Sequence, residues 1–157
     1  MSRPSRAYLV ALLTGPFLIA GALLSSSKEQ PDDHAQVAAV VRDYFEGWYT
    51  ADPERVARAL HPDMVKHYVE ALPSGRQVVQ TATRDLMVEM TRAGGGSNTP
   101  PERRNIVVGV VEVSGDIAIA RASSSQYLEY LSVARCNGQW VIINILWRFQ
   151  NPPRPAH

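Results

Sequence analysis

Residues 126–149 read QYLEYLSVARCNGQWVIINILWRF, a stretch that alternates as two β-strands around one short turn. Asn137-Gly138 is the dipeptide most typical of a two-residue hairpin, because both of its residues tolerate the positive φ of a type I′ turn. We therefore predict an antiparallel hairpin in which residues 126–136 pair with residues 139–149. In the second strand, one set of alternating positions is mixed and the other is wholly apolar, namely Val141, Ile143, Ile145, Trp147 and Phe149.

Two further strands are predicted before this hairpin. Residues 106–113 and 117–122 are rich in β-branched side chains, and the Ser114-Gly115-Asp116 sequence between them is typical of a turn. We expect these strands to pair antiparallel. The loop-forming patch GGGSNTPP at residues 94–101 separates this strand-rich half from a helical half. That order indicates an α+β domain.

The main helix of the first half is predicted to begin at Asp33. Asp33 and Gln36 have the spacing of a capping box, in which two side chains satisfy free amides at a helix start. The apolar residues that follow lie at helical spacing along one face; they are Val37, Val40, Val41, Tyr44, Phe45 and Trp48. The sequence thus predicts one long amphipathic helix.

Two shorter helices are predicted downstream. Asp52 before Pro53 is typical of an N-cap followed by the first helical residue, and this helix should end near Leu60. Thr83 should cap a third helix that ends at Gly94. The segment between them, residues 64–80, predicts a small hairpin or two irregular edge segments.

Composition excludes several classes of protein. The chain has 157 residues, 45% of them hydrophobic and 20% charged, which suits one globular domain. A formal net charge of +1 provides no strong field for binding nucleic acid. The single cysteine, Cys136, can form neither an internal disulfide nor a cysteine-rich zinc site. Metal chemistry would have to use histidines and carboxylates.

The N-terminus has the layout of an export signal. Arg3 and Arg6 precede an apolar run at residues 7–24, and the small residues 20–22 suit a cleavage site. The run is also close to the roughly 18 to 20 residues that cross about 30 Å of hydrocarbon, so an uncleaved membrane anchor is the alternative. Both interpretations place the domain outside the cytoplasm: secreted, periplasmic, or anchored on the outer face of the cytoplasmic membrane.

The predicted organisation has three parts. Residues 1–27 are a signal peptide or membrane anchor with an apolar leader helix, residues 32–150 are one α+β domain, and residues 151–157 are a disordered tail. Three N-terminal helices packed on a long, curved antiparallel sheet can cover one sheet face incompletely. The uncovered space would be a conical pocket between the sheet and the first helix, which is a binding cavity by default.

Motifs along nearly the whole domain carry a family resemblance. In chain order they are DYFEGWY (43–49), RALHPD (58–63), TRAGGG (91–96), EYL (129–131), NGQWVI (137–142) and NILW (144–147). With this order and spacing the sequence resembles the nuclear-transport-factor-2-like superfamily and, within it, the Putative lumazine-binding family. The resemblance implies a cone-shaped α+β fold, frequent homodimerisation through the sheet, and a cavity for a small molecule.

The resemblance does not imply a reaction. The superfamily contains enzymes, such as ketosteroid isomerase and polyketide cyclases, as well as non-catalytic modules. This chain departs from the family pattern in two ways: Glu129 stands where members tend to have aspartate before a Tyr-Leu pair, and an export leader is not a general family feature.

His61, Asp63 and His67 form one candidate constellation. On an extended backbone all three side chains would lie on one face and could supply a general acid and base. The interpretation that we favour is a turn, in which Pro62 fixes φ and Asp63 bonds nearby amides. The spacing matches no established metal site, so we predict no metal and no cofactor.

Other candidates are aromatic or amide side chains. Tyr44 and Trp48 could stack against a flat ligand, or could belong to the core. Asn144 could offer a donor and an acceptor to a ligand, or satisfy backbone at a sheet edge. Tyr127 and Tyr130 face opposite sides of their strand, so at most one points into the cavity. The residues proposed for ligand binding are therefore Tyr44, Trp48, His61, His67, Met90, Tyr130, Asn144 and Trp147.

Glu129 shares a strand face with Tyr127, Leu131 and Val133. If that face is inward, the carboxylate lies among apolar neighbours, its pKa should rise, and it could act as a general base. Buried unpaired carboxylates are rare, so we favour an outward Glu129 that pairs with a surface arginine.

The sequence leaves three function hypotheses. The favoured one is an exported, non-catalytic domain that binds a small hydrophobic or heteroaromatic ligand, with no nucleic-acid partner. The second is a lyase or isomerase in which Asp63 or Glu129 abstracts a proton from carbon, with Tyr44 or Tyr130 as the oxyanion donor. The third is a protein-interaction or dimerisation module of the cell envelope. A homodimer and membrane attachment through residues 7–24 are expected partnerships.

Overall fold

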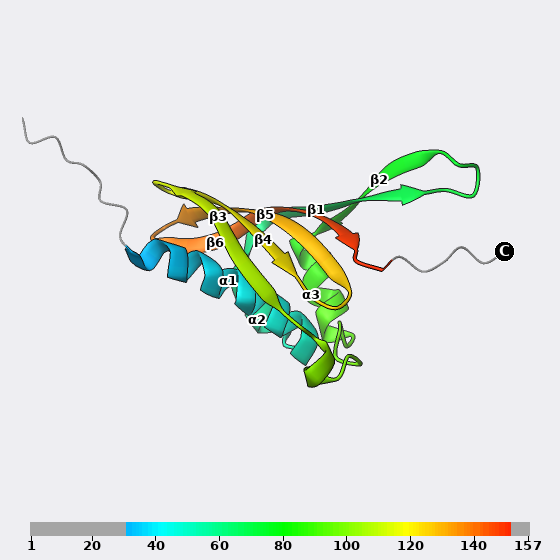
Figure 1. Cartoon of the computed structure of the whole chain (residues 1–157), viewed down its shortest axis with the longest axis horizontal. Helices are drawn as coiled ribbons and strands as arrows, with labels where there is room; N and C mark the ends of the chain where they lie inside the picture. The colour runs from blue at the N-terminus through cyan, green and yellow to red at the C-terminus, as the bar shows by residue number, and fades with distance from the viewer. Residues whose placement is uncertain (1–30, 152–157) are drawn as a thin grey trace, which may run out of the picture.

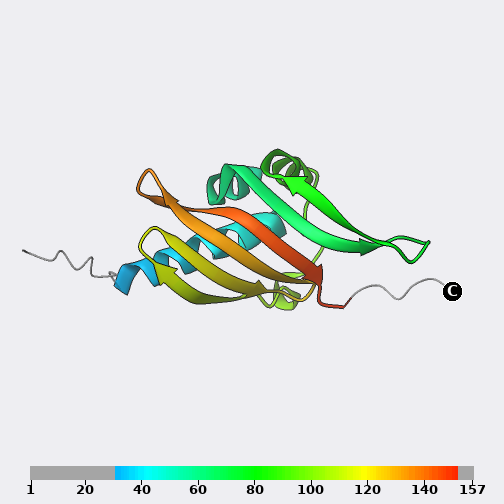
Figure 2. The ribbon, with the colours of Figure 1, turned by 90° about the horizontal axis from the view of Figure 1, so that it is seen from above.

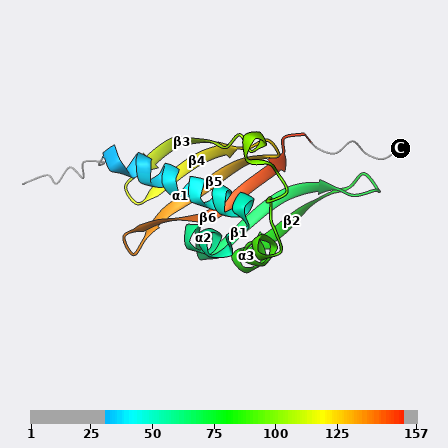
Figure 3. The same ribbon diagram turned by 90° about the horizontal axis from the view of Figure 1, so that it is seen from below.

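The computed structural model describes residues 31–151. Three α-helices lie on one face of a curved six-stranded sheet (Figures 1 and 3). The elements in chain order are α1 (Pro31–Thr50), α2 (Pro53–Ala59), β1 (Leu60–Ala71), β2 (Gln77–Thr83), α3 (Arg84–Arg92), the 3₁₀ helix η1 (Pro101–Arg103), β3 (Val107–Ser114), β4 (Ile117–Ser123), β5 (Tyr127–Cys136) and β6 (Gln139–Phe149).

The predicted leader at residues 1–27 lies outside the described residues, as does the predicted tail at residues 151–157 apart from Asn151. Their boundaries stay predictions. Within residues 31–151 no helix is both long enough and apolar enough to span a bilayer.

The first helix begins earlier than the capping-box pattern predicts. Helix α1 starts at Pro31, and proline suits the first turn because its missing N–H would have no helical partner there. Asp33 therefore lies inside the first turn, where its buried carboxylate accepts a hydrogen bond from Arg135 of β5. The side chain ties the start of α1 to the sheet.

The other predicted caps are confirmed. Asp52 accepts a hydrogen bond from the backbone N–H of Arg55 at 2.9 Å, which fixes the start of α2. Thr83 accepts one from the N–H of Leu86 at 3.3 Å, which begins α3 directly after β2. Local side-chain chemistry thus sets both helix starts.

The sheet is mixed, whereas the sequence pattern predicted an antiparallel one. Its strand order is β2-β1-β6-β5-β4-β3, and every neighbouring pair is antiparallel except β1 and β6 (Figure 2). These are the first and the last strand along the chain, so no turn connects them directly and the sequence does not indicate their relative direction. The predicted hairpin at Asn137-Gly138 is confirmed, with φ of 52° and 79° at the two residues.

A bulge in β6 changes which side chains face the helices. Ser132 pairs with Asn144 but Val133 pairs with Ile142, so Ile143 is an extra residue without a partner on β5. Simple alternation predicted Ile142 and Ile145 on opposite faces. With the bulge both are fully buried on the helix-facing side, together with Trp140.

The segment after α2 is a hairpin, as one of the two alternatives for residues 64–80 predicted, but it is longer than expected and its first strand includes the predicted turn at residues 61–63. Strands β1 and β2 pair from Val65 with Thr83 to Ala71 with Gln77, and the hairpin projects beyond the other strands (Figures 1 and 2). The pairing of β1 with β6 skips from Leu60 to Val65. The predicted turn at His61-Pro62-Asp63 is therefore a bulge within β1, where a proline without an N–H breaks no ladder bond.

The core lies between α1 and the sheet. From α1 come Val37, Val41, Phe45 and Tyr49, and from the sheet come Ala120, Leu131, Val133, Ile142 and Ile145, all at most 1% exposed. The predicted apolar stripe of the first helix thus covers the central strands. The alanines on β4 have small side chains, which leave room for α1 to pack closely on this strand.

Candidate functional site

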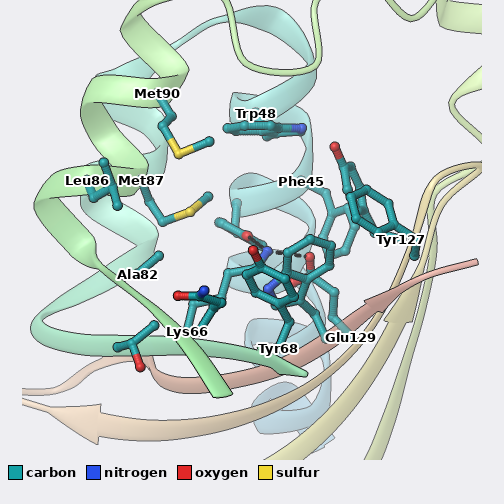
Figure 4. Close-up of a pocket in the computed structure, with 15 residues that line it drawn as sticks. Phe45, Trp48, Lys66, Tyr68, Ala82, Leu86, Met87, Met90, Tyr127 and Glu129 are labelled. Carbon is teal, nitrogen blue, oxygen red and sulfur yellow. Dashed lines mark hydrogen bonds and ion pairs between the residues drawn. The ribbon is translucent and has the colours of Figure 1, made fainter. Parts of the chain in front are cut away.

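A cavity of about 370 Å³ opens beside this core, within the range of small-molecule sites. Helix α1 packs on β3, β4 and β6, whereas α3 packs on β1 and β2 (Figure 3). The cavity lies between the two helices over the sheet (Figure 4). Tyr44, Phe45 and Trp48 reach it from α1, and Leu86, Met87 and Met90 reach it from α3. The sequence predicted such a hollow, because its helices cannot cover the whole curved sheet.

The sheet supplies the floor. Lys66 and Tyr68 come from β1, Tyr127 and Glu129 from β5, and Trp147 and Phe149 from β6. Alternation along each strand places these pairs on the helix-facing side. Several lining residues are also exposed, namely Gln80, Thr81, Leu86, Met90 and Phe149, so the mouth of the pocket lies between β2, α3 and the end of β6.

A buried ion pair lies on this floor. Lys66 Nζ donates to Glu129 Oε1 at 2.6 Å and to the Tyr44 hydroxyl at 2.8 Å. The side chains of Lys66 and Glu129 are only 7% and 2% exposed. Because solvent screening is weak in such a place, each charge depends on its partner. The pair joins β1 to β5 across 63 positions of sequence.

Glu129 lies opposite to the orientation that the sequence analysis favoured. It faces inward and pairs with Lys66, not with a surface arginine. Its second oxygen, Oε2, is buried and has no hydrogen-bond partner among the described residues. A buried acceptor without a hydrogen bond costs about 1–3 kcal/mol of stability. Oε2 is therefore a polar atom of the pocket that a ligand could satisfy.

Aromatic rings surround the lysine. Lys66 Nζ lies 4.8 Å from the ring centre of Trp147, 5.4 Å from that of Tyr44 and 5.8 Å from that of Tyr127. Tyr127 in turn contacts Trp147 edge-on, with 5.6 Å between ring centres. These rings stabilise the ammonium group through their negative faces and give the pocket flat walls.

Burial keeps the pocket tyrosines protonated. It raises the pKa of Tyr44 well above the usual value, and the nearby Glu129 carboxylate raises it further. Burial likewise raises the pKa of Tyr127. Both phenols therefore remain neutral hydroxyls at physiological pH and can still donate a hydrogen bond.

The glycine loop after α3 packs against Trp48, one of the residues that line the pocket. The N–H of Gly96 donates to the carbonyl oxygen of Trp48 at 3.0 Å. A Cβ on Gly96 would lie 2.6 Å from Nε1 of Trp48 and 2.7 Å from Cδ1 of Tyr49. The sequence indicated only a loop here, but the close approach shows why this position has no side chain.

Four of the eight predicted ligand-binding residues line the pocket: Tyr44, Trp48, Met90 and Trp147. His67, Tyr130 and Asn144 lie on the face of the sheet that the helices leave uncovered, and His61 lies in the β1 bulge, so none of these four lines the pocket. Their placement follows from strand alternation and from bulges that the sequence pattern does not reveal.

The structure brings His61 and Asp63 together, with 3.7 Å between His61 Nδ1 and Asp63 Oδ2, but outside the pocket and apart from His67. The Asp63 side chain is 92% exposed, and the backbone N–H of Asp63 donates to His61 Nδ1 at 3.1 Å. His67 lies near Thr81 instead, with 3.3 Å between its Nδ1 and the Thr81 hydroxyl. Among the described residues no cluster of three or more histidine, cysteine or acidic side chains could hold a metal ion.

Sequence reasoning missed Lys66, which anchors the polar part of the pocket. A signal was present: in Met64-Val65-Lys66-His67-Tyr68, alternation puts Lys66 on the same face as Met64 and Tyr68. A charged residue between two large apolar ones on one strand face indicates a buried, paired charge. The predicted turn at residues 61–63 hid this strand.

A family model described as "Putative lumazine-binding" matches residues 32–148. No curated protein sequence matches the chain. Solved structures do: an NTF-2 like protein of unknown function from Silicibacter pomeroyi is 17% identical, with a TM-score of 0.56, and the match covers 76% of this chain and 97% of that one.

Two further structures agree. A ketosteroid isomerase-like protein from Erwinia carotovora is 17% identical, with a TM-score of 0.53 and coverage of 78% of this chain and 100% of that one. An NTF2-like protein with a cystatin-like fold from Novosphingobium aromaticivorans is 13% identical, with a TM-score of 0.55 and coverage of 80% and 86%. At these identities the likeness shows the fold alone: an NTF2-like α+β fold with a curved mixed sheet and three helices.

Proposed function

Because the chain belongs to the Putative lumazine-binding family, we propose that its domain binds a small, flat heteroaromatic molecule in this pocket and does not transform it. The observation that carries the proposal is the cavity of about 370 Å³ walled by Trp48, Tyr127 and Trp147. Flat aromatic walls favour flat ligands, because offset or edge-on ring contacts add to the effect of apolar burial.

The methionine side of the pocket supports the same proposal. Met87 and Met90 project from α3 toward Trp48 across the cavity (Figure 4). Methionine is flexible and polarisable, so it adapts to the outline of a ring and contacts ring edges through sulfur. One face of a bound ring would thus meet rigid aromatic side chains, while its edge would meet adaptable ones.

Tryptophan fluorescence tests the proposal directly. The full-length protein is titrated with lumazine and, separately, with riboflavin, and we expect saturable quenching because Trp48 and Trp147 line the pocket. Trp147→Phe should remove a large part of the quenching. Trp140→Phe is the matched control, since Trp140 stacks under Arg135 away from the cavity and its loss should leave the quenching in place.

Native mass spectrometry of protein purified from its own host adds an independent measurement. We expect a co-purified small molecule that is lost on unfolding. A pocket that is empty after purification and that also ignores a panel of pterins, flavins and lipids would contradict the proposal.

One observation favours an isomerase or lyase as a second candidate. Glu129 is a carboxylate inside an apolar pocket, with the Tyr44 hydroxyl bonded to the same lysine, so a base and a donor lie together. Lys66 occupies Oε1, whereas Oε2 has no partner among residues 31–151 and could accept a proton from carbon. A β,γ-unsaturated ketone distinguishes the candidates. An isomerase would convert it to the conjugated enone, so the ultraviolet absorbance of the sample would rise. Glu129→Gln would abolish that rise. A binding protein would leave it unchanged.

We also propose that the domain acts outside the cytoplasm and forms a homodimer. The apolar run at residues 7–24 after Arg3 and Arg6 supports export, and fractionation of cells that express the tagged chain tests it.

The uncovered sheet face carries exposed apolar side chains, which support association through the sheet; they are Val111, Ile117, Ile119, Tyr130, Ile143 and Leu146. The open pocket lies on the helix side of the sheet, so association through the uncovered face is compatible with ligand binding.

A further inference from the structure

We infer that the pocket selects an uncharged ring that carries a cyclic amide or imide, in which an N–H stands next to a carbonyl group. The N–H would donate to Glu129 Oε2, and the carbonyl would accept from Lys66 Nζ. The inference rests on the proposed binding function and adds the chemical group that the ligand presents to the floor of the pocket.

Glu129 sets the requirement for a donor. The residue is 1% exposed and lines the cavity, Oε1 accepts from Lys66, and Oε2 has no partner among the described residues. An ionised carboxylate oxygen can only accept hydrogen bonds, so the group that satisfies Oε2 must bring an N–H or O–H. A ligand without such a group would bury the oxygen further while leaving it unpaired.

Lys66 sets the requirement for an acceptor. An ammonium group has three donors, and two of them are directed to Glu129 Oε1 and to the Tyr44 hydroxyl. Within the part of the chain that the structure describes, the third meets only the surrounding rings, of which Trp147 is nearest at 4.8 Å. Because Lys66 and Glu129 are bonded to each other, the available donor and acceptor lie side by side. The –NH–C(=O)– edge of a lactam offers an acceptor and a donor at matching adjacent positions.

The charge of the pocket disfavours ionic ligands. Lys66 and Glu129 are the only lysine, arginine, aspartate or glutamate residues among those that line it, and their formal charges cancel. An anion would bring a second negative charge beside Glu129, and a cation would bring a second positive charge beside Lys66. Like charges repel strongly where solvent screening is weak, so a neutral ring is favoured.

The test compares two ligands that differ by one methyl group. The full-length protein is titrated with 2-quinolone and with N-methyl-2-quinolone, which share the flat ring and the carbonyl but differ in the N–H. We expect 2-quinolone to bind about tenfold more tightly or better, as for a hydrogen bond to a charged group. This comparison needs no variant, so it stands even if a substitution prevents folding.

Glu129→Gln then tests the partner. The glutamine oxygen should turn toward Lys66, which needs an acceptor, and this leaves an NH₂ donor where Oε2 stood. A donor now faces the ligand N–H, so the preference for 2-quinolone should vanish or reverse. Glu102→Gln is the matched control, because it makes the same change at an exposed residue of η1 that does not line the pocket, and it should keep the preference.

A third ligand tests the charge argument. Quinoline-2-carboxylate has the same ring system and a negative charge, and we expect it to bind more weakly than 2-quinolone. Binding as tight as that of 2-quinolone would overturn the requirement for a neutral ligand.

The outcomes separate this inference from the function on which it rests. Equal affinities for the two quinolones in the unsubstituted protein, or a preference that Glu129→Gln leaves intact, would overturn the amide requirement while lumazine or flavin quenching could still uphold a binding domain. Failure of both quinolones to bind up to about 1 mM would overturn the inference as well. Absence of quenching by every heteroaromatic would remove the binding function itself.

Discussion

Lys66 is one of only two lysines in the chain, the other being Lys28. Its position inside an aromatic enclosure suits lysine better than arginine, because a compact ammonium group places three donors around one atom. Glu129 and Tyr44 take two of these donors, and ring faces surround the group. The charge is thereby held in a place where an isolated cation would not be stable.

Removing the lysine should expose how far Glu129 depends on it. Lys66→Met leaves a buried carboxylate without its partner, so we expect the free energy of unfolding to fall by about 3–5 kcal/mol, measured by urea denaturation. The double variant Lys66→Met with Glu129→Leu should recover most of that loss, because neither charge is then left unpaired.

Arg55 provides the comparison on the surface. It bridges Asp43 and Glu46, but all three side chains are at least 30% exposed. Solvent screens such pairs, so Arg55→Met should cost only about 0–1 kcal/mol. Equal effects of Lys66→Met and Arg55→Met would refute the account of the buried pair.

At the scale of elements, the pocket depends on how α1, α3 and the loop between α3 and η1 meet. Helix α3 starts immediately after β2, so it stands over the hairpin and apart from α1. The glycines after α3 then bring the chain back against Trp48, where the Gly96 N–H bonds a helix carbonyl. The loop thereby supports Trp48, which forms part of the pocket wall.

Gly96→Ala should disturb that wall. The added methyl group would lie 2.6 Å from Trp48 Nε1 and 2.7 Å from a ring carbon of Tyr49, and neither ring can move without repacking. We expect a loss of about 1–3 kcal/mol in the free energy of unfolding, as for other overpacked sites. Lumazine affinity should also fall, because Trp48 would be displaced.

Gly109→Ala is the matched control in β3. The nearest atom to its added Cβ is the Arg121 carbonyl oxygen at 3.9 Å, which is an ordinary contact. Urea unfolding of the two variants should therefore differ clearly. If Gly109→Ala destabilised the domain as much as Gly96→Ala, steric closure at Trp48 would not be the cause.

At the scale of the whole molecule, the helices cover one face of the sheet and leave the other open (Figures 2 and 3). Tyr130 and Leu146 pair across β5 and β6 on that open face and are 50% and 54% exposed. Exposed apolar side chains on an uncovered sheet face support the association proposed above. The proposed homodimer would use it and would leave the pocket, which lies on the helix side, accessible.

Leu146→Asp should weaken that association. A carboxylate at the centre of an apolar interface would lose water without gaining a partner, so we expect the chain to shift from dimer to monomer in sedimentation equilibrium. Val79→Asp is the control, because Val79 is 65% exposed but lies on the projecting hairpin. A chain that is already monomeric before substitution would contradict the dimer.

Much of the fold was readable because its signals are local. The Asn137-Gly138 hairpin and the caps at Asp52 and Thr83 each depend on residues within about three positions of one another, and all three are confirmed. Motif order along the chain identified the family for a similar reason: it is a property of the sequence itself.

The polar centre of the site was decided by tertiary structure. Lys66 meets Glu129 only because β1 joins β6 in parallel and β6 joins β5, an arrangement that no turn or spacing announces. The bulge at Ile143 likewise puts Ile142 and Ile145 on the same face of the last strand, whereas simple alternation puts them on opposite faces. The sequence by itself determined the three helices, the caps at Asp52 and Thr83, the last hairpin and the expectation of a hollow. Only the tertiary structure decided which side chains meet inside this hollow, because the strands that carry them are far apart in the sequence. The register of such strands follows from burying one whole sheet face and not from the residues next to each position.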